Sequence, residues 1–211
     1  MTIAEIYNQL GITPNLQEHM LRVTSVALFI QKHWIGEQLD PELLKTMLML
    51  HDVGNIVKFD FDKYPEFLGD EIKRVDYWKK KQQETITKYG ADDHDATVAM
   101  LEELRISSQI SQRIYDMGYW NVKVISERND WMLKVALYSD LRVGPMGILS
   151  MTDRVNDIHD RLAKYKNKPE LIGYSQELEK QIQEKMDVPV DQITDENIEV
   201  DQSLLQLELT S

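Results

Sequence analysis

The sequence predicts an all-α protein, a multi-helix bundle with a less regular acidic C-terminal extension. Its 211 residues contain only 9 Gly and 6 Pro, too little turn punctuation for many short strands. Apolar residues recur at helical spacing along most of the chain, and no segment has the period of a strand. Hydrophobic residues make up 42% of the chain, enough for a sizeable core.

Start and stop residues predict the first three helices. A short helix over residues 2–10 is closed by Gly11, and a second helix begins at Pro14. The apolar positions of the second helix share one face with His19, which therefore points inward. Asp40 caps a third helix that carries an apolar face up to Gly54. We expect His51 and Asp52 in its last turn, about 100° apart around the axis.

The later elements follow from the same signals. Residues 57–69 lack a clear period and are predicted to form a loop, and residues 70–89 a half-exposed helix ended by Gly90. Four further helices are expected from their caps. They start near Asp92 or Asp93, near Ser107 or Ser108, at Asp130 and at Ser150. His94 lies in the first turn of the first of these helices, and Asp140 faces inward from the third. A last amphipathic helix covers residues 170–186, and the acidic segment beyond it ends in LLQLEL, which we expect to dock on the rest of the chain.

Composition excludes several function classes. The chain has no Cys, which rules out disulfides, thiolate zinc sites and cysteine nucleophiles. Its net charge of −12, with no Lys or Arg after Lys185, disfavours binding to duplex nucleic acid. No apolar run approaches the roughly 20 residues that span a bilayer, and the N-terminus has no signal-peptide pattern. We therefore expect a cytoplasmic protein that does not bind membranes.

Four inward-facing polar residues on three helices are the main functional signal: His19, His51, Asp52 and Asp140. Each alone is explained by a hydrogen bond in the core. Without a metal, each of the four buried groups would need its own hydrogen-bond partner. One divalent metal that binds all four offsets the cost of burying them more simply. Nitrogen and oxygen donors suit such an ion, and a metal site suggests hydrolysis.

The order of these residues resembles the HD-domain superfamily of metal-dependent phosphohydrolases. The matching segments are EHMLRVTSVA, MLMLHDVGN and VALYSDLRVGP, and the resemblance covers roughly residues 15–165. It implies an HD-like metal-binding domain over residues 1–168, followed by a C-terminal helix and acidic tail over residues 169–211. It also implies that His19, His51, Asp52 and Asp140 bind a divalent transition metal, one ion per chain. Mn, Fe, Co, Ni and Zn all suit these ligands, and Mg is also allowed.

The resemblance implies roles for further residues. Asp52 would orient the attacking water or take its proton. His94 would protonate the leaving group or contact phosphate, and its alternative is a structural pair with Asp92 or Asp95. Many members have Lys where this chain has Asn55, so Lys58 is the candidate that supplies charge to the substrate, its alternative being a solvated loop lysine. Arg142 would bind phosphate at the rim of the site or pair with a loop carboxylate.

These features predict a metal-dependent phosphohydrolase. The substrate would be a small phosphorylated molecule of the nucleotide class, cleaved at a phosphomonoester or a phosphodiester. The alternative is a non-catalytic HD-like module that senses or binds a metal or a nucleotide. A third hypothesis, a helical interaction protein that uses its acidic tail, predicts no metal. The sequence leaves the oligomeric state open.

Overall fold

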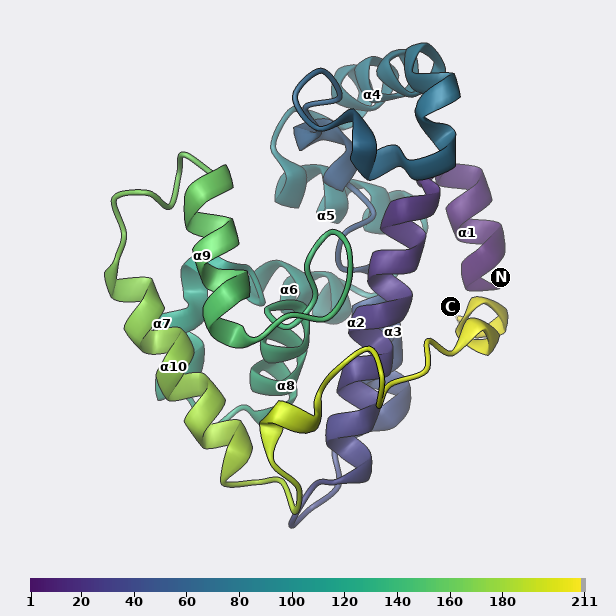
Figure 1. Ribbon diagram of the computed structural model, residues 1–211. Helices are drawn as coiled ribbons and strands as arrows, with labels where there is room; N and C mark the ends of the chain where they lie inside the picture. Colours follow the sequence, from purple (N-terminus) through teal and green to yellow (C-terminus); the bar gives the residue numbers. More distant parts are fainter. Residues whose placement is uncertain (210–211) are drawn as a thin grey trace. The chain divides into compact units, whose positions relative to one another are not determined.

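The structure is a computed structural model that describes residues 1–209, apart from the side chains of residues 66 and 67. Its α-helices are α1 (Ile3–Leu10), α2 (Pro14–Lys32), α3 (Pro41–Leu50), α4 (Val75–Tyr89), α5 (Asp93–Glu103), α6 (Ser108–Asp116), α7 (Val122–Glu127), α8 (Trp131–Asp140), α9 (Met151–Arg161) and α10 (Glu170–Gln183) (Figure 1). The 3-10 helices are η1 (Asn55–Lys58), η2 (Pro65–Arg74), η3 (Tyr119–Asn121), η4 (Val190–Gln192) and η5 (Gln202–Gln206). Within residues 1–209, β-structure is limited to three isolated bridges, and the predicted all-α class is confirmed.

Local capping chemistry explains several helix boundaries. Thr2 and Glu5 form a reciprocal capping box at α1, and Gly11 ends that helix in a left-handed conformation with φ of 69°. The remaining capping side chains that the sequence indicated accept hydrogen bonds from the first backbone N–H groups of α3, α5, α8 and α9: Asp40, Asp92, Asp130 and Ser150.

The end of α3 differs from the sequence prediction. The helix stops at Leu50, so His51 and Asp52 lie in the turn that follows it instead of in its last turn. The carbonyl of Leu48 accepts a hydrogen bond from the His51 ring, and the backbone N–H of Asn55 donates to the carbonyl of Asp52 in a tighter i→i+3 pattern. The imidazole thus donates a hydrogen bond to one of the last carbonyls of the helix, which lack backbone partners.

Two other segments are more ordered than predicted. The stretch expected to be a loop over residues 57–69 includes part of η1 and the start of η2. Residues 119–127, which carry no clear sequence signal, form η3 and α7. Both are short elements, whose few residues give too little periodicity to recognise.

The chain divides into two compact units, each built from separated segments. Unit 1 contains Met1–Leu21, Lys45–Tyr115 and the C-terminal residues from Asp201 on, and unit 2 contains Arg22–Leu44 and Asp116–Val200. Helices α2 and α3 each contribute to both units. Residues 169–200 belong to the same unit as residues 116–168.

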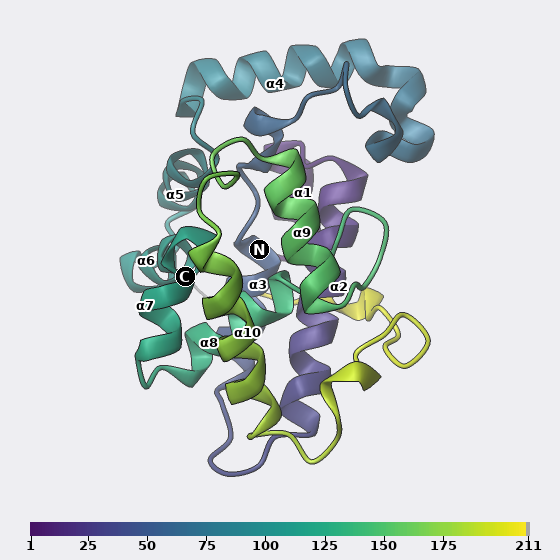
Figure 2. The same cartoon turned by 60° about the vertical axis from the view of Figure 1, so that its left-hand side comes forward.

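In unit 1, helix α5 packs against η1 and α4 around a small apolar core (Figure 2). The core residues are Ile56, Val57, Phe61, Leu68, Trp78 and Ala96. The C-terminal segment packs on α1, as the LLQLEL motif predicted, with η5 beside the helix (Figure 1). There the backbone N–H of Ile3 donates to the carbonyl of Leu207, and Leu204 is buried.

In unit 2, helix α10 packs against α7, α8 and α9 (Figure 2). Leu178 and Ile182 of α10 are fully buried, and Ser175 on the same face donates to the carbonyl of Leu171. No helix in the described part of the chain combines the length and apolarity needed to cross a bilayer.

Candidate metal site

His51 is held so that one ring nitrogen faces away from the backbone. Its Nδ1 lies 2.7 Å from the carbonyl oxygen of Leu48, and a carbonyl can only accept, so Nδ1 carries the proton. The neutral ring therefore has its lone pair on Nε2. The residue is only 5% exposed, which fixes the ring further. A histidine whose Nδ1–H is bound by a carbonyl is the usual arrangement of a metal-binding imidazole.

His19 and Asp52 lie beside this nitrogen in unit 1. The Oδ2 atom of Asp52 is 3.5 Å from Nε2 of His19 and 3.7 Å from Nε2 of His51. A ring nitrogen of His19 lies within 4.8 Å of one of His51, and the two ring centroids are 5.5 Å apart. The three donor groups thus form a compact cluster.

Two of the three separations in this cluster are close to those expected around one ion. Ligand atoms bound at about 2.1 Å from one ion lie roughly 3 to 3.4 Å apart. The separations of 3.5 and 3.7 Å from Asp52 to the two histidines exceed this by only a few tenths of an ångström, and the two imidazoles lie within 4.8 Å of each other. The donor set of two imidazoles and a carboxylate suits transition metals, and it contains no thiolate that would restrict the choice.

Tyr7 is a buried neighbour of this site that the sequence analysis missed. Its hydroxyl donates to the carbonyl of Met49 at 2.6 Å, and Met49 is two residues before His51. Burial and the negative charge of Asp52 raise the pKa of Tyr7 well above its ordinary value, so the phenol is neutral. The available signal was the spacing of Ile3, Ile6, Tyr7 and Leu10, which places Tyr7 on the inward face of α1.

Lys58 and His94 meet at a single carboxylate, that of Asp93. Nζ of Lys58 lies 2.7 Å from Asp93 Oδ2, and Nε2 of His94 lies 3.5 Å from the same oxygen. Asp93 is buried, whereas Asp92 contacts only backbone N–H groups as the cap of α5. The partner of His94 is thus Asp93 and neither Asp92 nor Asp95, the two carboxylates that the sequence suggested.

The first turns of α5 lie directly against the turn that carries the His51–Asp52 pair. The backbone N–H of Gly54 donates to the hydroxyl of Thr97 at 3.0 Å, and that hydroxyl donates to the carbonyl of Asp93 at 2.8 Å. The Lys58–Asp93–His94 group and the His51–Asp52 turn are therefore joined by direct contacts within unit 1.

Asp140 and Arg142 belong to unit 2. Asp140 is the last residue of α8 and is half-buried. Arg142 differs from the expectation of a rim position, because it is only 4% exposed. Its guanidinium donates to the carbonyls of Leu149, Val190 and Ile193 and to the hydroxyl of Tyr138. These bonds direct the guanidinium inward and give it a structural role.

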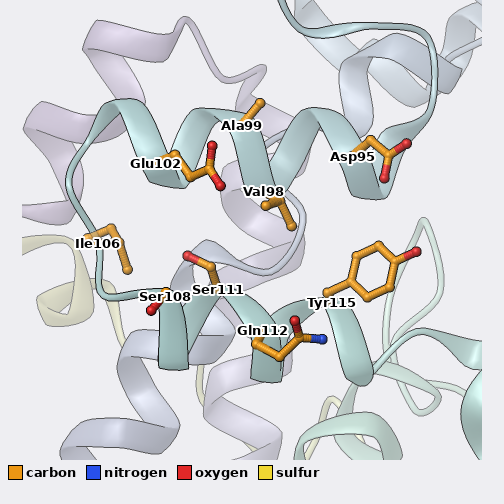
Figure 3. Close-up of a pocket in the computed structure, with 9 residues that line it drawn as sticks. All are labelled: Asp95, Val98, Ala99, Glu102, Ile106, Ser108, Ser111, Gln112 and Tyr115. Atoms are coloured by element: carbon orange, nitrogen blue, oxygen red, sulfur yellow. The ribbon is translucent and has the colours of Figure 1, made fainter.

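A hollow of about 480 Å³ lies between α5 and α6, and Tyr115, one of its lining residues, makes an edge-on ring contact with His94. Figure 3 shows its lining: Asp95, Val98, Ala99 and Glu102 of α5, Ile106, and Ser108, Ser111, Gln112 and Tyr115 of α6. Asp95 is two positions, roughly 200° around the helix, from Asp93. The hollow therefore lies on a different face of α5 from the one that contacts Gly54, and none of its lining residues is a predicted site residue.

Comparison with known proteins identifies a family for this chain. A family model described as HD domain matches residues 16–125, more than half of the chain. The match includes His19, the His51–Asp52 pair, Lys58 and His94, and it ends before Asp140. Searches of curated proteins and of solved structures gave no significant match. The helical fold, the clustered histidines and aspartate and this match lead to one conclusion: the chain belongs to the HD-domain family.

Proposed function

We propose that this chain is a metal-dependent phosphohydrolase that acts on a phosphorylated small molecule of the nucleotide class. The observation that carries the proposal is the cluster of His19, His51 and Asp52, in which the Nδ1 proton of His51 is bound by the Leu48 carbonyl. A purely structural histidine does not require this clustering. The HD family, in which such clusters bind metals that hydrolyse phosphoesters, supports the same function.

In this proposal His19, His51, Asp52 and Asp140 hold one divalent ion. Asp140 would add a second carboxylate to the two histidines and Asp52, as the order of the motif implies. The ion would be Mn, Fe, Co, Ni or Zn, with Mg also allowed by the oxygen donors. When bound, such an ion lowers the pKa of a coordinated water and polarises a phosphoryl oxygen.

The chain's own groups then assist the displacement at phosphorus. Asp52 orients the attacking water or accepts its proton. His94 gives a proton to the leaving oxygen, and Asp93 orients its ring. Lys58 contributes positive charge, because an ammonium has three N–H donors and its bond to Asp93 does not preclude another to a phosphate oxygen. Arg142 has no part in this proposal, because its donors are directed to groups inside unit 2.

The second candidate function is a non-catalytic module that binds a metal or a nucleotide. It is favoured by the two cations that were expected to hold phosphate, since Lys58 is paired with Asp93 and Arg142 is buried. A protein of this kind would retain the metal and bind ligands without turning them over.

The test begins with protein stripped of metal by a chelator and reloaded with each ion in turn. Metal content is measured, and hydrolysis of nucleoside monophosphates and cyclic nucleotides is followed by chromatography of the products, which separates monoester from diester cleavage. His51→Ala and Asp52→Ala are expected to lose both metal and turnover. His159→Ala is the matched control, because His159 contacts Tyr119 in unit 2 instead of the cluster.

Each outcome decides between the candidates. Turnover that persists in Asp52→Ala would show that the site is assigned wrongly. Metal retention without hydrolysis of any substrate would favour the non-catalytic module. Wild-type protein that retains no metal would contradict the phosphohydrolase and a module that binds metal.

A further inference from the structure

Residues 187–195, which follow α10, form an extended segment that we call the strap. It includes the short helix η4 and crosses unit 2 (Figure 1). At its start, the backbone N–H of Asp187 donates to the carbonyl of His33, and the Asp187 carboxylate lies 2.8 Å from Nδ1 of His33. Ile193, near its end, is 1% exposed. The acidic tail is thus fixed on unit 2 through residue 195.

Arg142, from the turn after α8, binds two carbonyls of the strap. Its two terminal nitrogens donate to the carbonyls of Val190 and Ile193 at 3.0 and 2.9 Å. The first of them also donates to the hydroxyl of Tyr138, which in turn donates to Glu179 of α10 at 2.9 Å. A planar fork with fixed donors can make these bonds together, and a lysine ammonium cannot reproduce them.

Asp195 makes a further contact near the end of the strap. One carboxylate oxygen accepts from the backbone N–H of Ile148 at 2.9 Å, in the loop that follows α8. The other lies 3.5 Å from Nε of Arg22 in α2. Arg22 is three residues after His19, and Arg142 is two residues after Asp140. The strap therefore engages one arginine next to each of two proposed metal ligands.

The turn that carries Asp140 is joined to the loop that follows it, because the backbone N–H of Leu149 donates to the carbonyl of Arg142 and Val143 pairs with Ile148. Helix α8 ends at Asp140, and the chain leaves it through two i→i+3 bonds, from Arg142 to Ser139 and from Val143 to Asp140. Helix ends fray more readily than helix interiors because their last carbonyls lack helical partners. A metal ligand at such an end needs external support, since affinity depends on ligand positions held within a few tenths of an ångström.

We propose that Arg142 and Asp195 are positioning residues that fix the α8 end for metal binding by Asp140, an inference that rests on the proposed function. Groups that orient metal ligands from outside typically change metal affinity 10- to 100-fold when removed. In this arrangement the strap contributes to the affinity without touching the ion.

The test compares Arg142→Lys and Asp195→Asn with the control Asp191→Asn. Asp191 is exposed on the same segment, and its substitution removes one negative charge, as Asp195→Asn does. Three quantities are measured on the full chain: the Mn²⁺ dissociation constant, the melting temperature of metal-free protein, and amide hydrogen exchange over residues 138–149 in metal-free protein. We expect Arg142→Lys and Asp195→Asn to weaken Mn²⁺ binding by about 10-fold or more and to speed exchange over residues 138–149. Asp191→Asn should match the wild type in both.

A purely structural strap would give a different result. Melting temperatures would fall while the Mn²⁺ dissociation constants stayed equal to the wild type, and this would overturn the inference. Unchanged hydrogen exchange over residues 138–149 in the two variants would also overturn the inference. Failure of the wild type to bind Mn²⁺ is a different result, which would contradict the proposed function, and the exchange measurement on metal-free protein would still test the inference. Should Arg142→Lys fail to fold, Asp195→Asn, which alters an exposed side chain, decides the question.

Discussion

The backbone N–H of Gly54 donates to the hydroxyl of Thr97 at 3.0 Å, which brings the turn after α3 into direct contact with α5. Gly54 has φ of −85°, a conformation open to any residue, so its backbone angles do not require glycine. Space does, because a Cβ at this position would lie 2.5 Å from the nitrogen of Thr97 and 2.7 Å from the carbonyl oxygen of Asp93. Both are backbone atoms that cannot rotate away.

Gly54→Ala is therefore expected to lower the free energy of unfolding by about 1 to 3 kcal/mol, the usual cost of overpacking. Urea denaturation of metal-free protein measures this change. Gly173→Ala is the matched control, because Gly173 is exposed in the first turn of α10 and an added Cβ there meets nothing within 4 Å. The control should gain about 0.5 to 1 kcal/mol. Equal stability of the Gly54 variant and the wild type would contradict the close approach.

The Lys58–Asp93 pair predicts a coupling in stability. Asp93 is buried and Lys58 is 36% exposed, so Lys58→Met removes a charged hydrogen bond from a mostly desolvated carboxylate. We expect a loss of about 1 to 2 kcal/mol. In the double variant Lys58→Met/Asp93→Asn part of this loss should be recovered, which urea denaturation of all four proteins would reveal as a nonzero interaction energy. Lys79→Met, from the exposed pair with Asp62, should leave stability unchanged.

Asp157 predicts a pH dependence. Burial alone would raise its pKa, but hydrogen bonds and charges from Arg161 and Arg154 outweigh burial and lower the pKa below the ordinary 3.8. The unfolded chain then binds this proton at a higher pH than the folded chain. The stabilisation is complete above the ordinary pKa and is lost as the pH falls through the folded value.

Asp157→Asn should therefore lower the free energy of unfolding by about 0.5 to 1 kcal/mol at pH 7. The difference from the wild type should shrink below the ordinary pKa of 3.8. Urea denaturation at pH 7, 5 and 3 measures it. Asp160→Asn, on an exposed position of the same helix, provides the comparison. A difference for Asp157→Asn that grows at pH 3 would contradict the assigned direction.

The C-terminal contact with α1 predicts that Leu204 stabilises unit 1. Leu204→Ala removes a side chain that is only 5% exposed and should cost about 2 kcal/mol or more. Limited proteolysis should then cleave near residue 200 faster than in the wild type. Gln206→Ala, an exposed change in the same 3-10 helix, should leave both the stability and the cleavage rate as they are.

Local signals in the sequence were sufficient for much of the fold. The Thr2–Glu5 spacing and Gly11 delimit α1, and Asp40 with Pro41 begins α3. These devices act over three or four residues, so the sequence contains all of their chemistry. Periodicity likewise directed His19 inward, where it lies beside Asp52.

Long-range partners could not be predicted in this way. The acceptors of Arg142 include carbonyls 48 and 51 residues away, and the partner of Lys58 is 35 residues away. Periodicity gives the direction of a side chain relative to its own helix but not the group that meets it.

Unit 1 is assembled from both ends of the chain, and this has a consequence for its synthesis. The ribosome makes α1 well before the segment that packs on it, which begins at Asp201. Until that segment has been made, the surface of α1 that it covers stays exposed. A nascent chain stalled before Asp201 should therefore be more sensitive to proteases at α1 than the folded protein.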